Sequence, residues 1–248
     1  MAFQVLGDRR WCEGAEVTSE DMIGQIARYV RHKCEISSGG VRVAIDGCGA
    51  AGKTTLADRL SEALQGEVGE VLRLWHRRLV QPRSLAVAVG PHESRGYYLG
   101  AFDIKHQDAD PLDSLGPGGR RRQSAAVGGI GLPGLTIWPA RSSSQLPTRP
   151  MNRSSLLFDG VFLLRPELAC RLMGSLDLRP PDARGLSSSR CGAGLFAHGG
   201  GPETATDRYL NHHLAGQARY HAEASPIDVA DIVIENADYE NLVFARVS

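Results

Sequence analysis

The chain has 248 residues, a length typical of one α/β domain with room for a small lid. Its 28 basic and 28 acidic residues balance, which argues against the broad charged surface of nucleic-acid-binding or membrane-surface proteins. No apolar run approaches the length of a membrane span, and residues 1–8 lack the pattern of a signal peptide. We therefore expect neither nucleic acid nor a membrane as a partner.

The five cysteines are dispersed and form no Cys-x-x-Cys pair; they are Cys12, Cys34, Cys48, Cys170 and Cys191. An odd number of scattered thiols is typical of a reducing compartment rather than of a disulfide framework. The sequence therefore predicts a cytoplasmic protein, and it leaves the oligomeric state open.

The first predicted element is an amphipathic helix over residues 19–34. Its apolar residues recur at helical spacing, and Ser19 stands where a helix cap is expected. The apolar stripe consists of Met22, Ile23, Ile26, Ala27 and Val30. Residues 37–40, Ser-Ser-Gly-Gly, then end the helix and lead into the first strand.

A glycine-rich motif follows directly and is the most informative segment. A strand-like run over residues 41–45 leads into Gly-x-x-x-x-Gly-Lys-Thr at residues 47–54, and apolar residues at helical spacing continue through residues 56–64. This order of strand, loop and helix distinguishes a phosphate-binding P-loop from a glycine-rich turn with an incidental lysine. The motif therefore predicts a site for a nucleoside triphosphate with Mg²⁺.

The P-loop residues have distinct expected roles. Backbone N–H groups close on phosphate oxygens, Lys53 brings a positive charge to the outer phosphates, and Thr54 offers its hydroxyl to Mg²⁺. The N-terminus of the following helix adds a partial positive charge beneath the phosphates. The predicted cofactor-binding residues are Gly47, Cys48, Gly49, Ala50, Ala51, Gly52, Lys53, Thr54 and Thr55.

Further strands are predicted along the chain. Residues 68–74, 155–164 and 229–236 have the apolar character of buried strands, and a helix is expected from Pro166, since proline suits a first helical turn. The alternation predicts an α/β fold of the P-loop NTPase type, with a parallel sheet, helices on both faces and a small lid.

Three long segments predict no packed element. They lie near residues 75–89, 120–153 and 172–201, and they lack clear apolar spacing where Arg, Ser, Gly and Pro are frequent. Such long irregular stretches are uncommon in a compact domain.

Asp159, within the apolar run of residues 155–164, is the second candidate metal ligand. In P-loop folds a carboxylate at the end of a neighbouring strand reaches Mg²⁺ directly or through water. Thr54 and Asp159 would then share one octahedral ion with phosphates and waters. The alternative is an aspartate that only starts a turn with Gly160. The pattern favours the metal role, and we predict Lys53 and Asp159 as catalytic residues.

Several segments, in order, resemble the uridine kinase-like group of P-loop kinases, relatives of phosphoribulokinase. They are Val43–Gly47, Ser94–Asp103, Leu112–Gly119, Leu157–Leu168, Arg208–Tyr209 with Gly216, Gln217 and Tyr220, and Ala230–Asn236. The resemblance implies transfer of phosphate from ATP to a hydroxyl of a small molecule, most commonly a nucleoside.

The same resemblance implies a closing lid, from which Arg208 would contact phosphate. An exposed arginine on a helix surface is the equal alternative for Arg208. We also divide the chain into an N-terminal helix and linker, residues 1–40, and a P-loop kinase-like domain, residues 41–248.

The chain departs from that group where its catalytic acid is expected. After the second strand the family usually carries an aspartate that accepts the proton of the substrate hydroxyl, whereas residues 74–79 here are Leu-Trp-His-Arg-Arg-Leu. His76 is a weak substitute, because a lone histidine is more often structural or exposed. Loss of a general base typically lowers a rate by ~10²–10⁴-fold, so we expect catalysis to be impaired.

Two other functions compete with that of a kinase. One is a nucleotide-binding protein without catalysis, which would bind ATP and show no acceptor-dependent turnover. The other is a P-loop GTPase, which the sequence disfavours because no Asn-Lys-x-Asp motif occurs. Because the resemblance stops and resumes in blocks, we also hypothesise that residues 75–89 and 172–189 were translated in a shifted reading frame, which resequencing of the gene would test.

Overall fold

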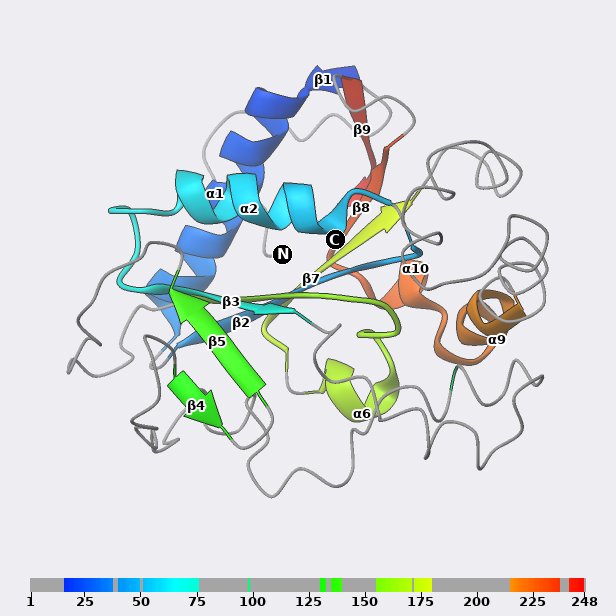
Figure 1. Ribbon diagram of the computed structural model, residues 1–248. Coiled ribbons are helices and arrows are strands. Elements are labelled where there is room, and N and C mark those ends of the chain that lie inside the picture. The colour runs from blue at the N-terminus through cyan, green and yellow to red at the C-terminus, as the bar shows by residue number, and fades with distance from the viewer. Residues whose placement is uncertain are drawn as a thin grey trace, which may run out of the picture.

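The structure is a computed structural model that describes residues 16–37, 40–49, 51–75, 98, 130–132, 135–139, 155–170, 172–179, 215–236 and 241–247. The described strands form one mixed sheet in the order β1-β9-β8-β7-β2-β6-β3-β5-β4 (Figure 1). The strands are β1 (Glu16–Thr18), β2 (Val41–Gly47), β3 (Val71–Trp75), β4 (Ile130–Leu132), β5 (Leu135–Pro139), β6 (Ser155–Asp159), β7 (Gly174–Arg179), β8 (Ile232–Glu235) and β9 (Asn241–Val247). The helices are α1 (Ser19–Ile36), α2 (Lys53–Ala63), α6 (Pro166–Ala169), α9 (Ala215–Ala224) and α10 (Pro226–Val229).

The centre of the sheet is parallel. Strands β8, β7, β2, β6 and β3 run in one direction, so their carboxyl ends meet at one edge. Antiparallel strands border this group, β9 beside β8 and β5 beside β3. The P-loop strand β2 is central, with Ile45 opposite Asp159 of β6 and Asp46 opposite Asp177 of β7. The predicted α/β fold with a parallel sheet is therefore confirmed.

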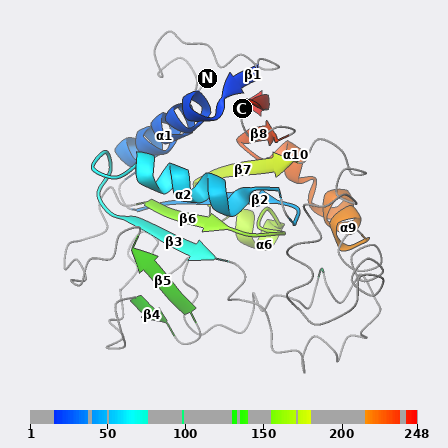
Figure 2. The same ribbon diagram turned by 45° about the horizontal axis from the view of Figure 1, so that its top comes forward.

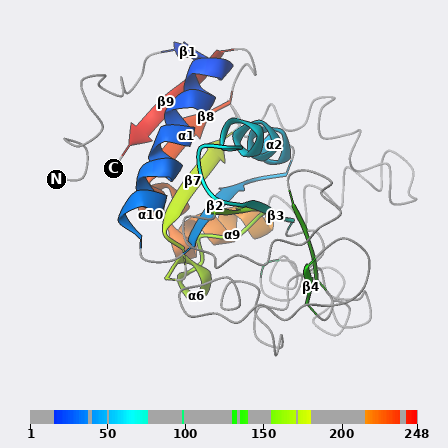
Figure 3. The same ribbon diagram turned by 90° about the vertical axis from the view of Figure 1, so that its left-hand side faces the viewer.

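Helices cover both faces of the sheet, as predicted (Figure 2). Helices α1 and α2 lie on one face, where α2 packs across β2, β6 and β3, and α1 packs beside it toward β9 (Figure 3). Helices α6, α9 and α10 lie on the other face. Each face has its own apolar core, the first including Met22, Ile26, Ile45 and Leu60, and the second including Leu74, Phe158, Phe162 and Tyr220. Helix α1 thus shares a core with the P-loop strand, and the division of the chain at residue 40 stays a prediction.

The predicted elements form with shifted ends. Helix α1 begins at Ser19, but Thr18 is its cap, with a side-chain oxygen that accepts a hydrogen bond from the backbone N–H of Asp21. The run of residues 155–164 is a strand only as far as Asp159. In the run of residues 229–236, Val229 is the last residue of helix α10, and the strand begins only at Ile232.

The prediction for residues 172–201 was wrong at its start. Residues 174–179 form β7, which pairs with β2 on one side and β8 on the other. Only Leu176 and Leu178 of this strand face the first core, and Asp177 lies between them, so the apolar signal was too short to recognise. Hydrogen bonds from two parallel neighbours stabilise the strand instead.

The prediction for residues 120–153 was wrong as well, since β4 and β5 lie inside this range and pair antiparallel. Strand β5 also pairs with β3, so contacts far along the chain rather than local periodicity define it. Of the segment near residues 75–89, Trp75 ends β3 and the rest lies outside the described residues. The reading-frame hypothesis stays a hypothesis.

Candidate phosphate-binding site

The P-loop connects the carboxyl end of β2 to the N-terminus of α2, and the two glycines that define its motif, Gly47 and Gly52, both adopt positive φ. Gly47 has φ 144° and lies so close to β7 that a Cβ atom would be 2.3 Å from the carbonyl oxygen of Leu178. Gly52 has φ 89°, and a Cβ atom there would be 2.8 Å from Nδ2 of Asn236. Only glycine fits these two positions, which is why the motif spacing fixes the loop's path.

The N-terminus of α2 is open to an anion. No side chain caps this helix, so the first backbone N–H groups have no partner within the helix. Thr54 and Thr55, in its first turn, are exposed, as is Gly49 in the loop. An uncapped helix start beside a glycine-rich loop is a favourable position for phosphate. Ala50, the remaining residue of the predicted cradle, lies outside the described residues.

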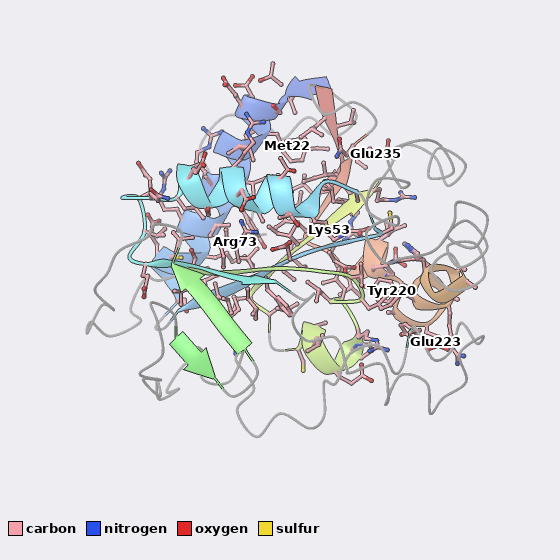
Figure 4. The ribbon with its side chains drawn as sticks, in the orientation of Figure 1. Met22, Lys53, Arg73, Tyr220, Glu223 and Glu235 are labelled. Carbon is pink, nitrogen blue, oxygen red and sulfur yellow. The ribbon has the colours of Figure 1, made fainter. Side chains whose placement is uncertain are left out.

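Lys53 folds back over this loop, as Figure 4 shows near the N-terminal end of α2. Its ammonium donates a hydrogen bond of 2.5 Å to the backbone oxygen of Cys48. Burial lowers the pKa of Lys53, while the charges of Asp46, Asp159 and Asp177 act in the opposite direction. The ammonium therefore faces several carboxylates, and no described carboxylate forms a close ion pair with it. It is positioned to exchange the loop carbonyl for phosphate oxygens.

Thr54 and Asp159 meet, as the sequence predicted for two ligands of one metal ion. The hydroxyl of Thr54 donates to Oδ2 of Asp159 at 2.9 Å, although the residues are 105 positions apart. The other carboxylate oxygen, Oδ1, accepts a hydrogen bond of 2.8 Å from Arg73 of β3. Arg73 also contacts Asp58 of α2 at 2.5 Å, and its label marks it beneath that helix in Figure 4.

The residues present fit Mg²⁺ bound with phosphates. Hydroxyl and carboxylate oxygens are the ligands that Mg²⁺ prefers, and it usually keeps several waters and substrate oxygens. Within the described ranges, no three His, Cys, Asp or Glu side chains form a group that could hold a metal ion. Thr54 and Asp159 would therefore supply two ligands at most, and phosphates and waters the others. Because Arg73 already holds Asp159, contact of this carboxylate with the ion through water is favoured.

Asp46, the last residue before Gly47, is fully buried and belongs to a second network. Its Oδ1 accepts a hydrogen bond from the backbone N–H of Leu163 at 3.0 Å, and its Oδ2 accepts one from the hydroxyl of Tyr220 at 2.5 Å. The Tyr220 oxygen in turn accepts from the backbone N–H of Leu164 at 3.0 Å. Burial raises the pKa of Asp46, and these hydrogen bonds oppose the rise. The P-loop strand is thereby joined to α9 and to the loop after β6.

Asp177 lies beside Asp46 on the neighbouring strand and is 2% exposed. Its Oδ2 has no hydrogen-bond partner. Burial, followed by the charge of Asp46, raises the pKa of Asp177 to about 7, against the opposing effect of Arg179 and Lys53. This carboxylate is therefore a source of pH-dependent instability.

Asp177→Asn should remove that pH dependence. As pH rises above about 4, an unfolded aspartate loses its proton first, so the wild-type free energy of unfolding falls until the folded group ionises near pH 7. We expect the stability of the variant relative to wild type to grow by about 2–3 kcal/mol between pH 5 and pH 7.5, and then to level off. Urea unfolding at a series of pH values measures this difference, and a difference that stays constant with pH would contradict the assignment.

Four residues of the site were missed as functional candidates. Asp46, Arg73 and Asp177 are charged residues inside apolar strands, and Asn236 follows the last parallel strand. A charge within an apolar strand is costly unless it is paired, which is the signal that could have identified the first three. Asn236 donates from Nδ2 to the backbone oxygen of Ala51 at 2.9 Å and so supports the P-loop from β8.

Two residues with predicted roles lie outside the part of the chain that the structure describes. Arg208, predicted to contact phosphate, lies outside the described residues, as does His76. Of the chain that the structure does describe, no helix is both long and apolar enough to span a bilayer. Three of the cysteines, Cys34, Cys48 and Cys170, lie in the described ranges, and no disulfide joins them there.

Some of the solved structures with a similar fold are named as kinases. D-glycerate 3-kinase from Cryptococcus neoformans var. grubii is 10% identical, with a TM-score of 0.52 over 86% of this chain and 94% of that chain. The YGR205w protein is 9% identical, with a TM-score of 0.53 over 94% and 100%. The chain has the P-loop kinase fold.

A possible uridine kinase from Bacillus stearothermophilus is 19% identical, with a TM-score of 0.49 over 84% of this chain and 98% of that chain. No protein-family model and no curated protein matches the sequence. The structures with TM-scores above 0.5 confirm the expected P-loop kinase fold, and the chemistry has to be argued from the site.

Proposed function

We propose that the protein transfers a phosphoryl group from ATP to a hydroxyl of a small molecule, with a nucleoside as the first acceptor to test. The observation that carries this proposal is the contact between Thr54 and Asp159 beside an uncapped helix start and the half-buried ammonium of Lys53. Phosphoryl transfer needs positioning and charge neutralisation more than covalent chemistry from the protein, and this arrangement provides both.

Each residue has a defined part in the proposed reaction. The amides at the start of α2 and Lys53 bind phosphate oxygens, while Thr54 and Asp159 hold Mg²⁺ directly or through water. ATP supplies the phosphoryl group, and Mg²⁺ neutralises part of its charge. Asn236 supports the loop through the backbone oxygen of Ala51. Arg208 is proposed, from the resemblance alone, to reach the phosphates from a lid.

A nucleotide-binding protein without catalysis is the second candidate, and one observation favours it. Both oxygens of Asp159 are already held, one by Thr54 and the other by Arg73, so this carboxylate is poorly placed to accept a proton. The segment at residues 74–79 contains no acid either. A protein with this site would bind MgATP and turn it over slowly or not at all.

Turnover of ATP across a panel of acceptors separates the two candidates. The panel should hold nucleosides, sugars and hydroxy acids, because the similar structures are named for acceptors as different as uridine and D-glycerate. We expect formation of ADP that requires both Mg²⁺ and one class of acceptor. Binding of MgATP in calorimetry without acceptor-dependent ADP would support the second candidate, and absence of any ATP binding would exclude both.

A further inference from the structure

The loop between β6 and α6, residues 160–165, carries a backbone conformation that needs support. Phe162 has φ 63°, in the left-handed region that residues other than glycine rarely adopt. This loop begins directly after Asp159, the last residue of β6. Phe162 itself is 1% exposed and packs against Tyr220, with ring centroids 5.1 Å apart.

Two hydrogen bonds hold the loop to the P-loop strand β2, and a third holds it to α9. The backbone N–H of Gly160 donates to the oxygen of Ile45 at 3.2 Å. The N–H groups of the two residues after Phe162 donate to Asp46 and Tyr220, which are themselves joined by a 2.5 Å hydrogen bond. The side chains of Asp46 and Tyr220 thus form one acceptor unit for the strained turn, contributed by β2 and α9.

We propose that Asp46 and Tyr220 act together as a clamp that positions Asp159 against Thr54 for a divalent cation. The inference rests on the proposed function, because the divalent cation is the Mg²⁺ that would bind together with ATP. Both are positioning residues, since neither is argued to touch phosphate or metal. The clamp joins α9 to the strand that leads into the P-loop.

The clamp itself is tested in the ligand-free protein by amide hydrogen exchange. Tyr220→Phe keeps the ring and removes the hydroxyl that accepts from Leu164 and donates to Asp46. Tyr29→Phe is the matched control, because it removes a hydroxyl that is also buried but lies in the other core and makes no hydrogen bond to residues 160–165. We expect exchange at Leu163 and Leu164 to become about tenfold faster in Tyr220→Phe and to stay unchanged in Tyr29→Phe. Equal exchange in both variants would overturn the clamp.

Its effect on the cation is tested by the affinity for ATP with and without Mg²⁺. We expect Tyr220→Phe to reduce the gain in affinity that Mg²⁺ gives by about tenfold, while affinity for ATP without Mg²⁺ stays close to wild type. Urea unfolding checks the folded fraction of the variant. If the substitution only lowered stability, Mg²⁺ would still increase the affinity for ATP as much as in wild type. An unchanged gain would overturn the positioning role.

Asp46→Asn serves as the second variant and should act in the same direction, because it weakens the acceptor shared by Leu163 and Tyr220. If wild type binds no ATP, the proposed function fails, and the exchange experiment still decides whether the clamp exists.

Discussion

Lys53→Ala should abolish nearly all acceptor-dependent turnover of ATP. In the proposed site the half-buried Lys53 brings its positive charge to the phosphates, and loss of one such charge-stabilising group typically lowers a rate by about 10²–10³-fold. Lys53→Met, which keeps the length of the side chain, should lose as much activity, because the charge and not the packing is responsible. The measurement is the rate of ADP formation at saturating Mg²⁺.

The matched control is Lys33→Ala. Lys33 lies in the last turn of α1, 5.2 Å from the ring centroid of Tyr29 and away from the P-loop. We expect its removal to leave turnover and ATP affinity at wild-type values. Activity that survives in the Lys53 variants would exclude the proposed phosphate site, whatever the fold.

Asp159→Asn should have two separable effects. The first is loss of the gain in ATP affinity that Mg²⁺ gives, since an amide is a much weaker ligand for the ion than a carboxylate. The second is a decrease of about 2–3 kcal/mol in the free energy of unfolding, because Arg73 is 6% exposed and loses its buried counter-ion while keeping Asp58. Calorimetry measures the first effect and urea unfolding the second.

Asp58→Asn is the control for both effects. It removes the other partner of Arg73, but its side chain is 58% exposed, so we expect a loss below about 1 kcal/mol and no change in the effect of Mg²⁺. Replacing Arg73 by Met together with Asp159→Asn should cost less stability than the sum of the two single changes, since the unpaired buried charge is then absent. Additive losses would show that the pair does not interact.

The core of the site was predictable from the sequence because it depends on local backbone rules. A β-branched strand, the glycines at positions 47 and 52, a lysine, a threonine and a helix follow one another, and glycine is the residue that adopts the positive φ found at both positions. The pairing of Thr54 with Asp159 was predictable for a related reason, since parallel strands bring their carboxyl ends to one edge.

Strand β7 and the charges around Lys53 were not predictable in the same way. Residues 174–179 contain only two inward leucines, and their strand exists because β2 and β8 pair with it from both sides. Arg73, Asp46 and Asp177 stand in three strands that are distant in sequence, so their contacts depend on the order of strands in the sheet. No local pattern specifies that order.

The sequence by itself therefore determined the α/β class and the strand–loop–helix order of the P-loop, because short-range conformational preferences and apolar periodicity encode them. Tertiary structure alone decided which buried charges surround Lys53, and how Tyr220 and Asp46 hold the turn at Phe162. The physical reason is that burial and strand pairing, which set the pKa values and select the hydrogen-bond partners, arise only when residues far apart in the chain are packed together.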